Sequence, residues 1–151
     1  MVIERPFTDE DRVESLKAAV LAGIAAGMVA AILLLAHRVP SLGGRAALAS
    51  IVAGLSGSSF WVSAAIAGLS GALFGITYRY AVRQDLNPQL KAGVVLAFSL
   101  VRGLALVNVA AAVSLGGWPF GAAIAESLLI FAAAAASLEL ARQQSWIKPV
   151  Q

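Results

Sequence analysis

Cysteine is absent from this chain of 151 residues, and histidine occurs only once, as His37. The absence of thiols excludes disulfides, thiolate metal sites and a cysteine nucleophile. A single histidine excludes a multi-histidine metal site and a haem held by two histidines of one chain. The serines of the two GLSG segments lack the full nucleophile-elbow pattern and a histidine base. We therefore predict a protein that is not an enzyme and that holds no metal and no cofactor.

Charged residues are scarce as well, at 13% of the sequence, whereas hydrophobic residues make up 60% and the mean hydropathy is +0.84. A soluble domain of this length needs far more polar surface. The formal net charge is only +3, and it is spread over positions that flank apolar segments, which argues against nucleic acid as a partner. The composition predicts an all-α integral membrane protein with a single membrane domain over residues 1–151, in contact with the lipid bilayer.

Four apolar stretches predict four transmembrane helices, because each is close to the roughly 20 residues that cross a bilayer. They lie at about residues 16–37, 61–80, 90–115 and 119–140. A fifth apolar segment, at about 46–57, is too short to span and predicts an interfacial helix between the first two spans.

Two helix starts carry local signals. Thr8 and Asp11 have the spacing of a capping box, so a helix is expected to begin after Thr8 and to continue into the first span. Asn87 suits the cap position before the third span, and Pro88 suits its first helical position, where a missing amide costs nothing.

The distribution of charge predicts the topology. The acidic N-terminus lacks the positively charged leader and the small-residue cleavage site of a signal peptide, so we expect the first span to be retained. Basic residues are concentrated on the side of the termini, which predicts that both termini are cytoplasmic or stromal. On that side the counted residues are Arg5, Arg12, Lys17, Arg79, Arg83, Lys91, Arg142 and Lys148, against Arg38 and Arg45 on the other.

Small residues recur at helical spacing in the first two spans. Gly23 and Gly27 form a GxxxG pair, and Gly68, Gly71 and Gly75 lie on two adjacent small-residue stripes. Such stripes let the backbones of neighbouring membrane helices approach closely. We interpret these five glycines as helix-packing positions.

A possible internal repeat divides the chain into two halves. LKAAV at 16–20 is nearly matched by LKAGV at 90–94, and SAAIA at 63–67 by GAAIA at 121–125. Each pair falls at the start of corresponding spans, so two helical hairpins in parallel orientation are one reading. Chance similarity between alanine-rich membrane helices is the other.

Four polar residues fall inside the third and fourth spans, namely Arg102, Asn108, Glu126 and Glu139. Ionisable residues at such depth face protein or water rather than lipid, so Arg102 requires a partner. With residue 117 taken as the middle of the connecting turn, Asn108 and Glu126 lie at one depth, and Arg102 is roughly 10 Å along the axis from both Glu126 and Glu139. The lean of helical side chains toward the N-terminus then favours Glu139 as its partner.

Structural interpretations of the same residues stay open. Glu139 is three residues from Arg142 and suits an ordinary interfacial pair. Arg102 suits a role in helix packing or a stem that extends toward the membrane surface. Glu126 suits a proton or cation site, a contact with a partner subunit, or a protonated carboxyl bound to Asn108.

The segments TYRYAVRQDLNPQLKAGVVLAFSLVRGLA and AAIAGLSGALFG are similar to small uncharacterised multi-pass membrane proteins of cyanobacteria and chloroplasts. The similarity covers roughly residues 60–115 and brings no catalytic residue with it. What this resemblance implies is a thylakoid or plasma membrane location in a photosynthetic organism.

Two function classes follow. The first is a non-enzymatic accessory or assembly subunit, an assembly factor that packs its small-residue faces against other membrane proteins. The second is a small transporter or channel for ions, protons or a solute, which acts as an oligomer through self-association and uses Glu126, Asn108 and Arg102. Short loops favour the first, because four spans with one or two buried charges provide only a thin pathway within one chain.

Overall fold

A computed structural model of the chain describes residues 8–36, 57–112 and 118–150, together with residues 49, 53 and 55. Over these residues the chain forms four long helices and no strand, and each helix is long and apolar enough to cross a membrane. The helices are α1 (Asp9–Ala36), α3 (Ser58–Val82), α4 (Pro88–Ala112) and α5 (Trp118–Gln143). The prediction of an all-α protein with four spans is thus confirmed. His37, the turn at 116–117 and most of the segment at 46–57 lie outside the described residues.

Both predicted helix starts have the expected capping contacts. The hydroxyl oxygen of Thr8 accepts a hydrogen bond from the amide of Asp11 at 3.2 Å and donates one to the Asp11 carboxylate at 3.0 Å. At the other start, the Asn87 side chain accepts from the amide of Gln89 at 2.9 Å, and Pro88 is the first helical residue. These contacts satisfy amides that have no partner within the first helical turn.

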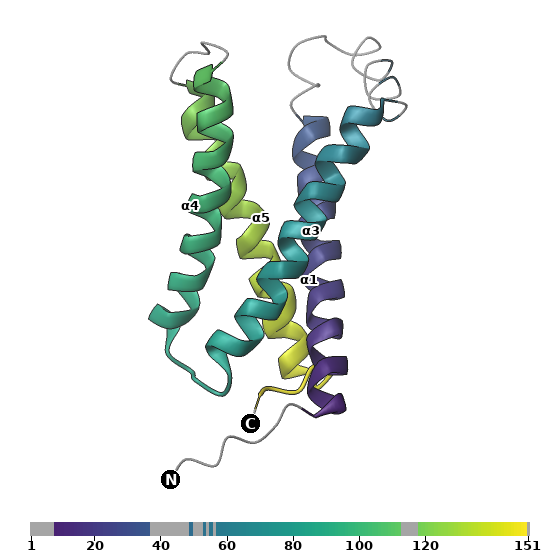
Figure 1. Cartoon of the computed structure of the whole chain (residues 1–151), viewed down its shortest axis with the longest axis vertical. Coiled ribbons are helices and arrows are strands. Elements are labelled where there is room, and N and C mark those ends of the chain that lie inside the picture. The colour runs from purple at the N-terminus through teal and green to yellow at the C-terminus, as the bar shows by residue number, and fades with distance from the viewer. Residues whose placement is uncertain are drawn as a thin grey trace.

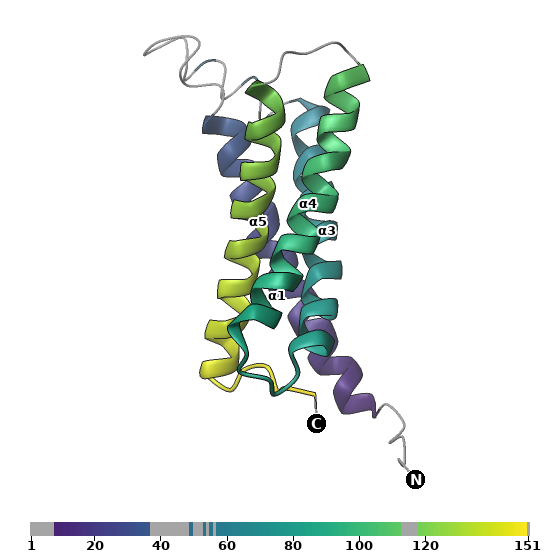
Figure 2. The ribbon, with the colours of Figure 1, turned by 90° about the vertical axis from the view of Figure 1, so that its left-hand side faces the viewer.

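The helices form two antiparallel hairpins, α1 with α3 and α4 with α5 (Figure 1). Helix α5 joins the hairpins, because it also packs against α1 and, less extensively, against α3. The start of α1, the α3–α4 link and residues 144–150 lie at the same end of the bundle, as Figure 2 also shows. We call this the polar end, and the opposite one the far end. Toward the far end the hairpins diverge in Figure 1.

The five glycines lie where α1 and α3 approach each other most closely. A Cβ atom built on Gly23 would lie 3.0 Å from the carbonyl oxygen of Gly68, and one on Gly75 would lie 2.5 Å from that of Ala18. Gly71 and Gly27 likewise face the backbone of the opposite helix. Hydrogen at the α-carbon therefore sets the distance between the two helices at Gly71 and Gly75, where a Cβ would lie less than 3.0 Å from a backbone atom, whereas Gly27 and Gly68 would make only ordinary contacts.

The core that unites all four helices lies in the half of the bundle near the polar end. Phe74 of α3 contacts Phe98 of α4 and Phe131 of α5, with ring centroids 5.3 Å apart in both pairs. Toward the far end, Ile130 packs with three alanines of α1 and α3, Ala26, Ala30 and Ala67. Among the described residues, neither core cluster includes a residue of α4 beyond Phe98 or a residue of α5 before Ile130. Beyond these levels the two hairpins no longer share a core.

Candidate functional site

Arg79 is the centre of the polar end. The side chain comes from the last turns of α3 and is only 4% exposed. Its guanidinium donates to the Asp11 carboxylate at 3.2 Å, to the Asp11 carbonyl oxygen at 3.1 Å and to the hydroxyl of Ser15 at 2.8 Å. Its Nε donates to the carbonyl oxygen of Lys148 at 3.1 Å. One arginine thus connects α3 to the first turns of α1 and to the C-terminal segment.

Residues 144–150 fold back across the polar end. The amide of Lys148 donates to the buried carboxylate of Glu14 at 2.9 Å, and Ile147 and Val150 are buried beside it. The ammonium of Lys148 contacts Glu10 at 2.6 Å, a hydrogen bond that raises the pKa of this lysine above its ordinary value. The segment therefore fastens α5 to α1 with both polar and apolar contacts.

A second cluster surrounds Glu139 of α5. Its carboxylate accepts from the Tyr78 hydroxyl at 2.9 Å, from Lys91 at 2.9 Å and from Arg142 at 3.2 Å. The hypothesis that Glu139 is the partner of Arg102 is therefore wrong. Glu139 does pair with Arg142, as the alternative interpretation expected, but it also binds side chains of two other helices. The cluster joins α3, α4 and α5 near the polar end.

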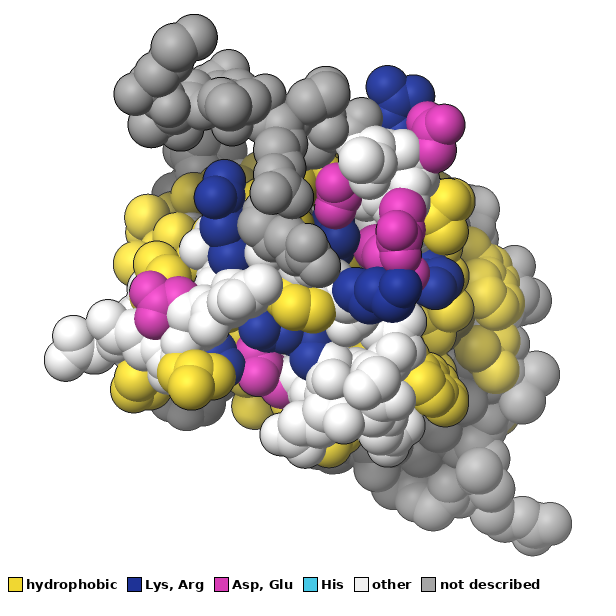
Figure 3. Space-filling model, turned by 90° about the horizontal axis from the view of Figure 1, so that it is seen from below, with side chains coloured by type: hydrophobic (Ala, Val, Ile, Leu, Met, Phe, Trp, Pro, Cys, Tyr) yellow, Lys and Arg dark blue, Asp and Glu magenta, His cyan; other side chains and the backbone are white. Residues whose placement is uncertain are grey.

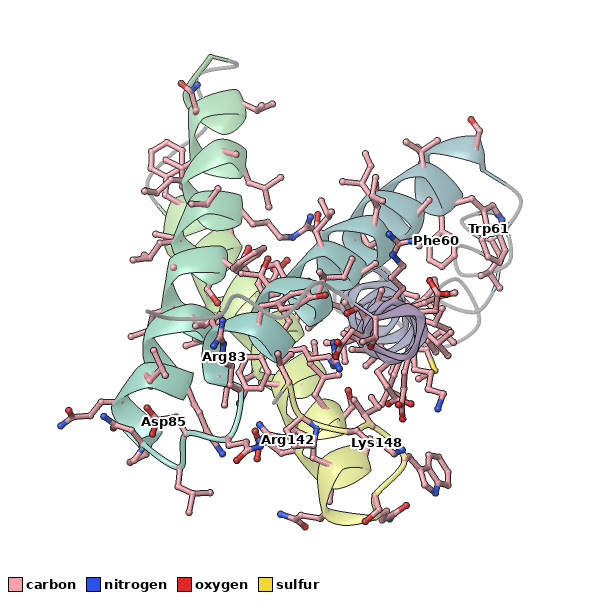
Figure 4. All side chains as sticks on the ribbon, turned by 60° about the horizontal axis from the view of Figure 1, so that its bottom comes forward. Phe60, Trp61, Arg83, Asp85, Arg142 and Lys148 are labelled. Atoms are coloured by element: carbon pink, nitrogen blue, oxygen red, sulfur yellow. The ribbon has the colours of Figure 1, made fainter. Side chains whose placement is uncertain are left out.

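The two views of the polar end show how much charge gathers there. Seen from below in Figure 3, basic and acidic side chains alternate over the middle of this end and apolar side chains surround them. In Figure 4, Arg83, Asp85, Arg142 and Lys148 lie at this end, whereas Phe60 and Trp61 lie at the far end of α3. We call these paired charges at the polar end the charged layer. Such a layer suits the headgroup region of a bilayer.

Arg102 and Glu126 lie at similar depth, which corrects the register expected from the sequence. The hydroxyl of Ser99 lies 3.5 Å from the carbonyl oxygen of Ser127, and Gly103 faces Ile124. Both contacts place Arg102 opposite the residues just before Glu126, and Glu126 acts electrostatically on it. The expected offset was wrong because residue 117 is not the midpoint. Helix α4 ends at Ala112 and α5 begins at Trp118, and the contacts between them centre their pairing several residues before residue 117.

The same register separates Asn108 from Glu126. The contacts place Ser99 opposite Ser127 and Gly103 opposite Ile124. In this register Asn108 lies opposite a position about seven residues before Glu126, and thus roughly 10 Å closer to the far end. The expectation that the two share one depth is therefore wrong. Asn108 is exposed on α4.

Arg102 lies near the middle of the bilayer. It follows Lys91, a member of the charged layer, by 11 residues. That spacing is about 16 Å of helix, which is close to half of a ~30 Å hydrocarbon core. The side chain is partly buried, and its Nε is the one buried side-chain nitrogen or oxygen atom without a hydrogen-bond partner among the residues that the structure describes.

Helical periodicity shows which way the two charged residues face. Arg102 follows Phe98 by one turn, and Phe98 faces Phe74 of α3. Glu126 precedes Ile130 by one turn, and Ile130 faces α1 and α3. Both residues therefore lie on the inner faces of the α4–α5 hairpin, one turn beyond the shared core. We call this surface, with Arg102, Leu106, Ala122 and Glu126, the inner hairpin face.

Arg79 was not among the site residues predicted from the sequence, where it was only one of the basic residues counted on the side of the termini. Its partners lie in three segments, and no local pattern links them. One signal was present, because Asp11 and Ser15 are spaced to lie on the same side of α1 as Ala18 and Ala22, the buried side. Two polar residues that continue a buried small-residue stripe indicate a polar contact with another element.

Together the four apolar helices and the charged layer at one end define a multi-pass helical membrane protein. Among the described residues no group of histidine and carboxylate side chains is placed to hold a metal ion. No protein-family model matches the chain, and no curated protein or solved structure matches it.

Proposed function

We propose that this protein is a non-enzymatic accessory or assembly subunit that binds a helix of another membrane protein on its inner hairpin face. The observation that carries the proposal is the position of Arg102. Its charge lies near mid-membrane, one turn beyond the shared core, and its Nε has no hydrogen-bond partner among the described residues. A guanidinium at this depth costs several kcal/mol unless a polar group or water meets it.

The apolar surroundings favour a helix as the occupant. Leu106 continues the inner face of α4 one turn beyond Arg102, and Ala122 continues that of α5 one turn beyond Glu126. A helix that lies on this face contacts apolar side chains along its length and meets the charged side chains of Arg102 and Glu126 at its middle. The complementary partner presents a carboxylate, carboxamide or hydroxyl at mid-membrane, because these groups accept hydrogen bonds from arginine.

Substitution of Arg102 tests the proposal. We expect Arg102→Leu to reduce the partner recovered with the tagged protein from native membranes in mild detergent by about tenfold to a hundredfold, the size of one hydrogen bond to a charged group. Glu126→Gln should reduce it less, because it leaves the guanidinium in place. Mass spectrometry of the purified material measures the recovery, and native gel migration reports the size of the complex.

The stability of the purified variant separates lost binding from lost folding. Arg102→Leu combined with Glu126→Gln removes both charges from an apolar region, so the isolated double variant should unfold in detergent at the same free energy as the wild type or a higher one. Equal recovery of the partner and equal native migration with Arg102→Leu and Glu126→Gln would refute the role given to Arg102. Recovery of the wild type alone would refute the accessory function.

Transport is the second candidate function. The shared depth of Arg102 and Glu126 favours it over a purely structural role for these two residues. Buried Ser99 and Ser127 lie beside them on the α4–α5 interface, so a polar layer crosses the hairpin near mid-membrane. In an oligomer such layers combine into a pathway. Proton or ion flux into liposomes that disappears with Glu126→Gln would support transport over the accessory function.

We further propose that the polar end faces the cytoplasm or stroma, in a plasma or thylakoid membrane. The supporting observation is that all the described basic residues except Arg102 lie at this end, which suits the positive-inside rule. Because the chain has no cysteine, single cysteines report its topology directly. For the protein in the plasma membrane, an impermeant maleimide should label Ser58→Cys in intact cells and Gln144→Cys only after permeabilisation, and the reverse pattern would overturn the orientation.

A further inference from the structure

A groove lies at the polar end, between α1 and the C-terminal segment, on a surface separate from the inner hairpin face. It has a volume of about 510 Å³ and is lined by Lys17, Leu21, Ala141, Ser145, Trp146 and Ile147. Three of the lining residues, Leu21, Ala141 and Ile147, are apolar and form the floor of the groove. The other three carry a cation, a hydroxyl and an indole N–H, all of which donate hydrogen bonds.

Lys17 is the one charged residue in the lining. Its ammonium contacts the buried carboxylate of Glu14 at 2.7 Å, and its side chain is half exposed. An ammonium has three donors, and this contact uses one. The amide of Lys148 also donates to Glu14, so the carboxylate is satisfied within the protein. Lys17 therefore retains donors for an anionic group in the groove.

The neighbouring residues place the groove at the level where lipid headgroups meet the apolar core. Lys17 is one turn beyond Glu14, a member of the charged layer, and its neighbours Leu16 and Val20 are both more than half exposed. Trp146 is 67% exposed. Indoles and lysines with exposed apolar neighbours are typical of the membrane interface, where the apolar part contacts acyl chains and the polar part contacts headgroups.

We propose that this groove binds a glycerophospholipid, with its phosphate at Lys17, Ser145 and Trp146 and its acyl region over Leu21, Ala141 and Ile147. A basic site between helices at the headgroup level suits this ligand, because the phosphate takes charge-assisted hydrogen bonds and the chains cover apolar surface. A soluble anion would use only the rim and leave the floor uncovered.

The test uses the full chain, purified in detergent, depleted of lipid and returned to phosphatidylglycerol. Native mass spectrometry counts the bound lipid, and thermal unfolding measures the stabilisation. We expect one retained phosphatidylglycerol and a raised unfolding temperature. Diacylglycerol with the same chains, which lacks the phosphate, should give neither effect, and inorganic phosphate alone should give no stabilisation. Equal effects of diacylglycerol or of inorganic phosphate would overturn the proposal.

Two variants locate the site. Lys17→Gln should lower retention of phosphatidylglycerol about fivefold, as expected for one lysine at the membrane surface, and Trp146→Ala should lower it as well. Arg12→Gln is the matched control, because it removes an exposed cation of the same helix outside the groove, and its retention should equal that of the wild type. Retention that is unchanged in both Lys17→Gln and Trp146→Ala would refute the site.

Discussion

Replacement of Arg79 by alanine should lower the free energy of unfolding by about 3 kcal/mol, because it removes several hydrogen bonds from a buried guanidinium and each such bond contributes roughly 1.5–3 kcal/mol. The substitution removes the hydrogen bonds from the guanidinium to buried Ser15, to Asp11 and to the carbonyl oxygen of Lys148. Three segments of the polar end lose their common contact at once. Unfolding in mixed detergent and dodecyl sulfate micelles, followed by tryptophan fluorescence, measures the loss.

Arg12 provides the matched control for Arg79. It carries the same charge at the same end, but its side chain is 76% exposed and its contact with Asp9 is 3.6 Å long. Exposed pairs of this kind contribute roughly 0–1 kcal/mol, so Arg12→Ala should unfold nearly as the wild type does. Arg79→Lys should fall between the two, because an ammonium cannot reproduce the planar fork of donors. If Arg79→Ala and Arg12→Ala were equally stable, the assigned role of Arg79 would be wrong.

The helices were predictable because their signals are local. A span is set by a run of apolar residues, and the starts of α1 and α4 are set by Thr8 and by Asn87 with Pro88, whose partners are within three residues. The bilayer limits backbone structure to helices or closed barrels, so composition alone already excluded most folds. For the same reason the helix ends fell within a few residues of the expected ones, including the start of α1 directly after Thr8.

The contacts between helices were less predictable, because they depend on register and direction rather than on composition. An error of a few residues in the midpoint of the α4–α5 connection paired Arg102 with Glu139, whereas Glu139 is bound to Lys91 and Tyr78. Each residue of error shifts a side chain by 1.5 Å along the axis and by 100° around it. Partners of charged residues in antiparallel helices are therefore decided by the length of the turn.

The small-residue stripes are the part of the tertiary structure that the sequence anticipates best, and Gly71 tests them most sharply. We expect Gly71→Ala to destabilise the protein by about 1–3 kcal/mol, the usual cost of an overpacked site. The new Cβ would overlap with that of Ala26 and would lie 2.7 Å from the carbonyl oxygen of Ala22. Helix propensity acts in the opposite direction, because alanine is favoured over glycine by up to about 1 kcal/mol, so the sign of the result shows which effect is larger.

Gly93 of α4 isolates the propensity effect, because a Cβ built there meets nothing within 4 Å. Gly93→Ala should leave the free energy of unfolding unchanged or raise it by up to about 1 kcal/mol.

The double variant Ala26→Gly with Gly71→Ala moves one methyl group across the α1–α3 interface. It removes the overlap with Ala26 but not the close approach to Ala22. The two substitutions should therefore be coupled favourably, by roughly 0.5–3 kcal/mol, without restoring wild-type stability. If the effects of the two substitutions on the free energy of unfolding were strictly additive in the same micellar assay, residues 26 and 71 would not be in contact across the α1–α3 interface.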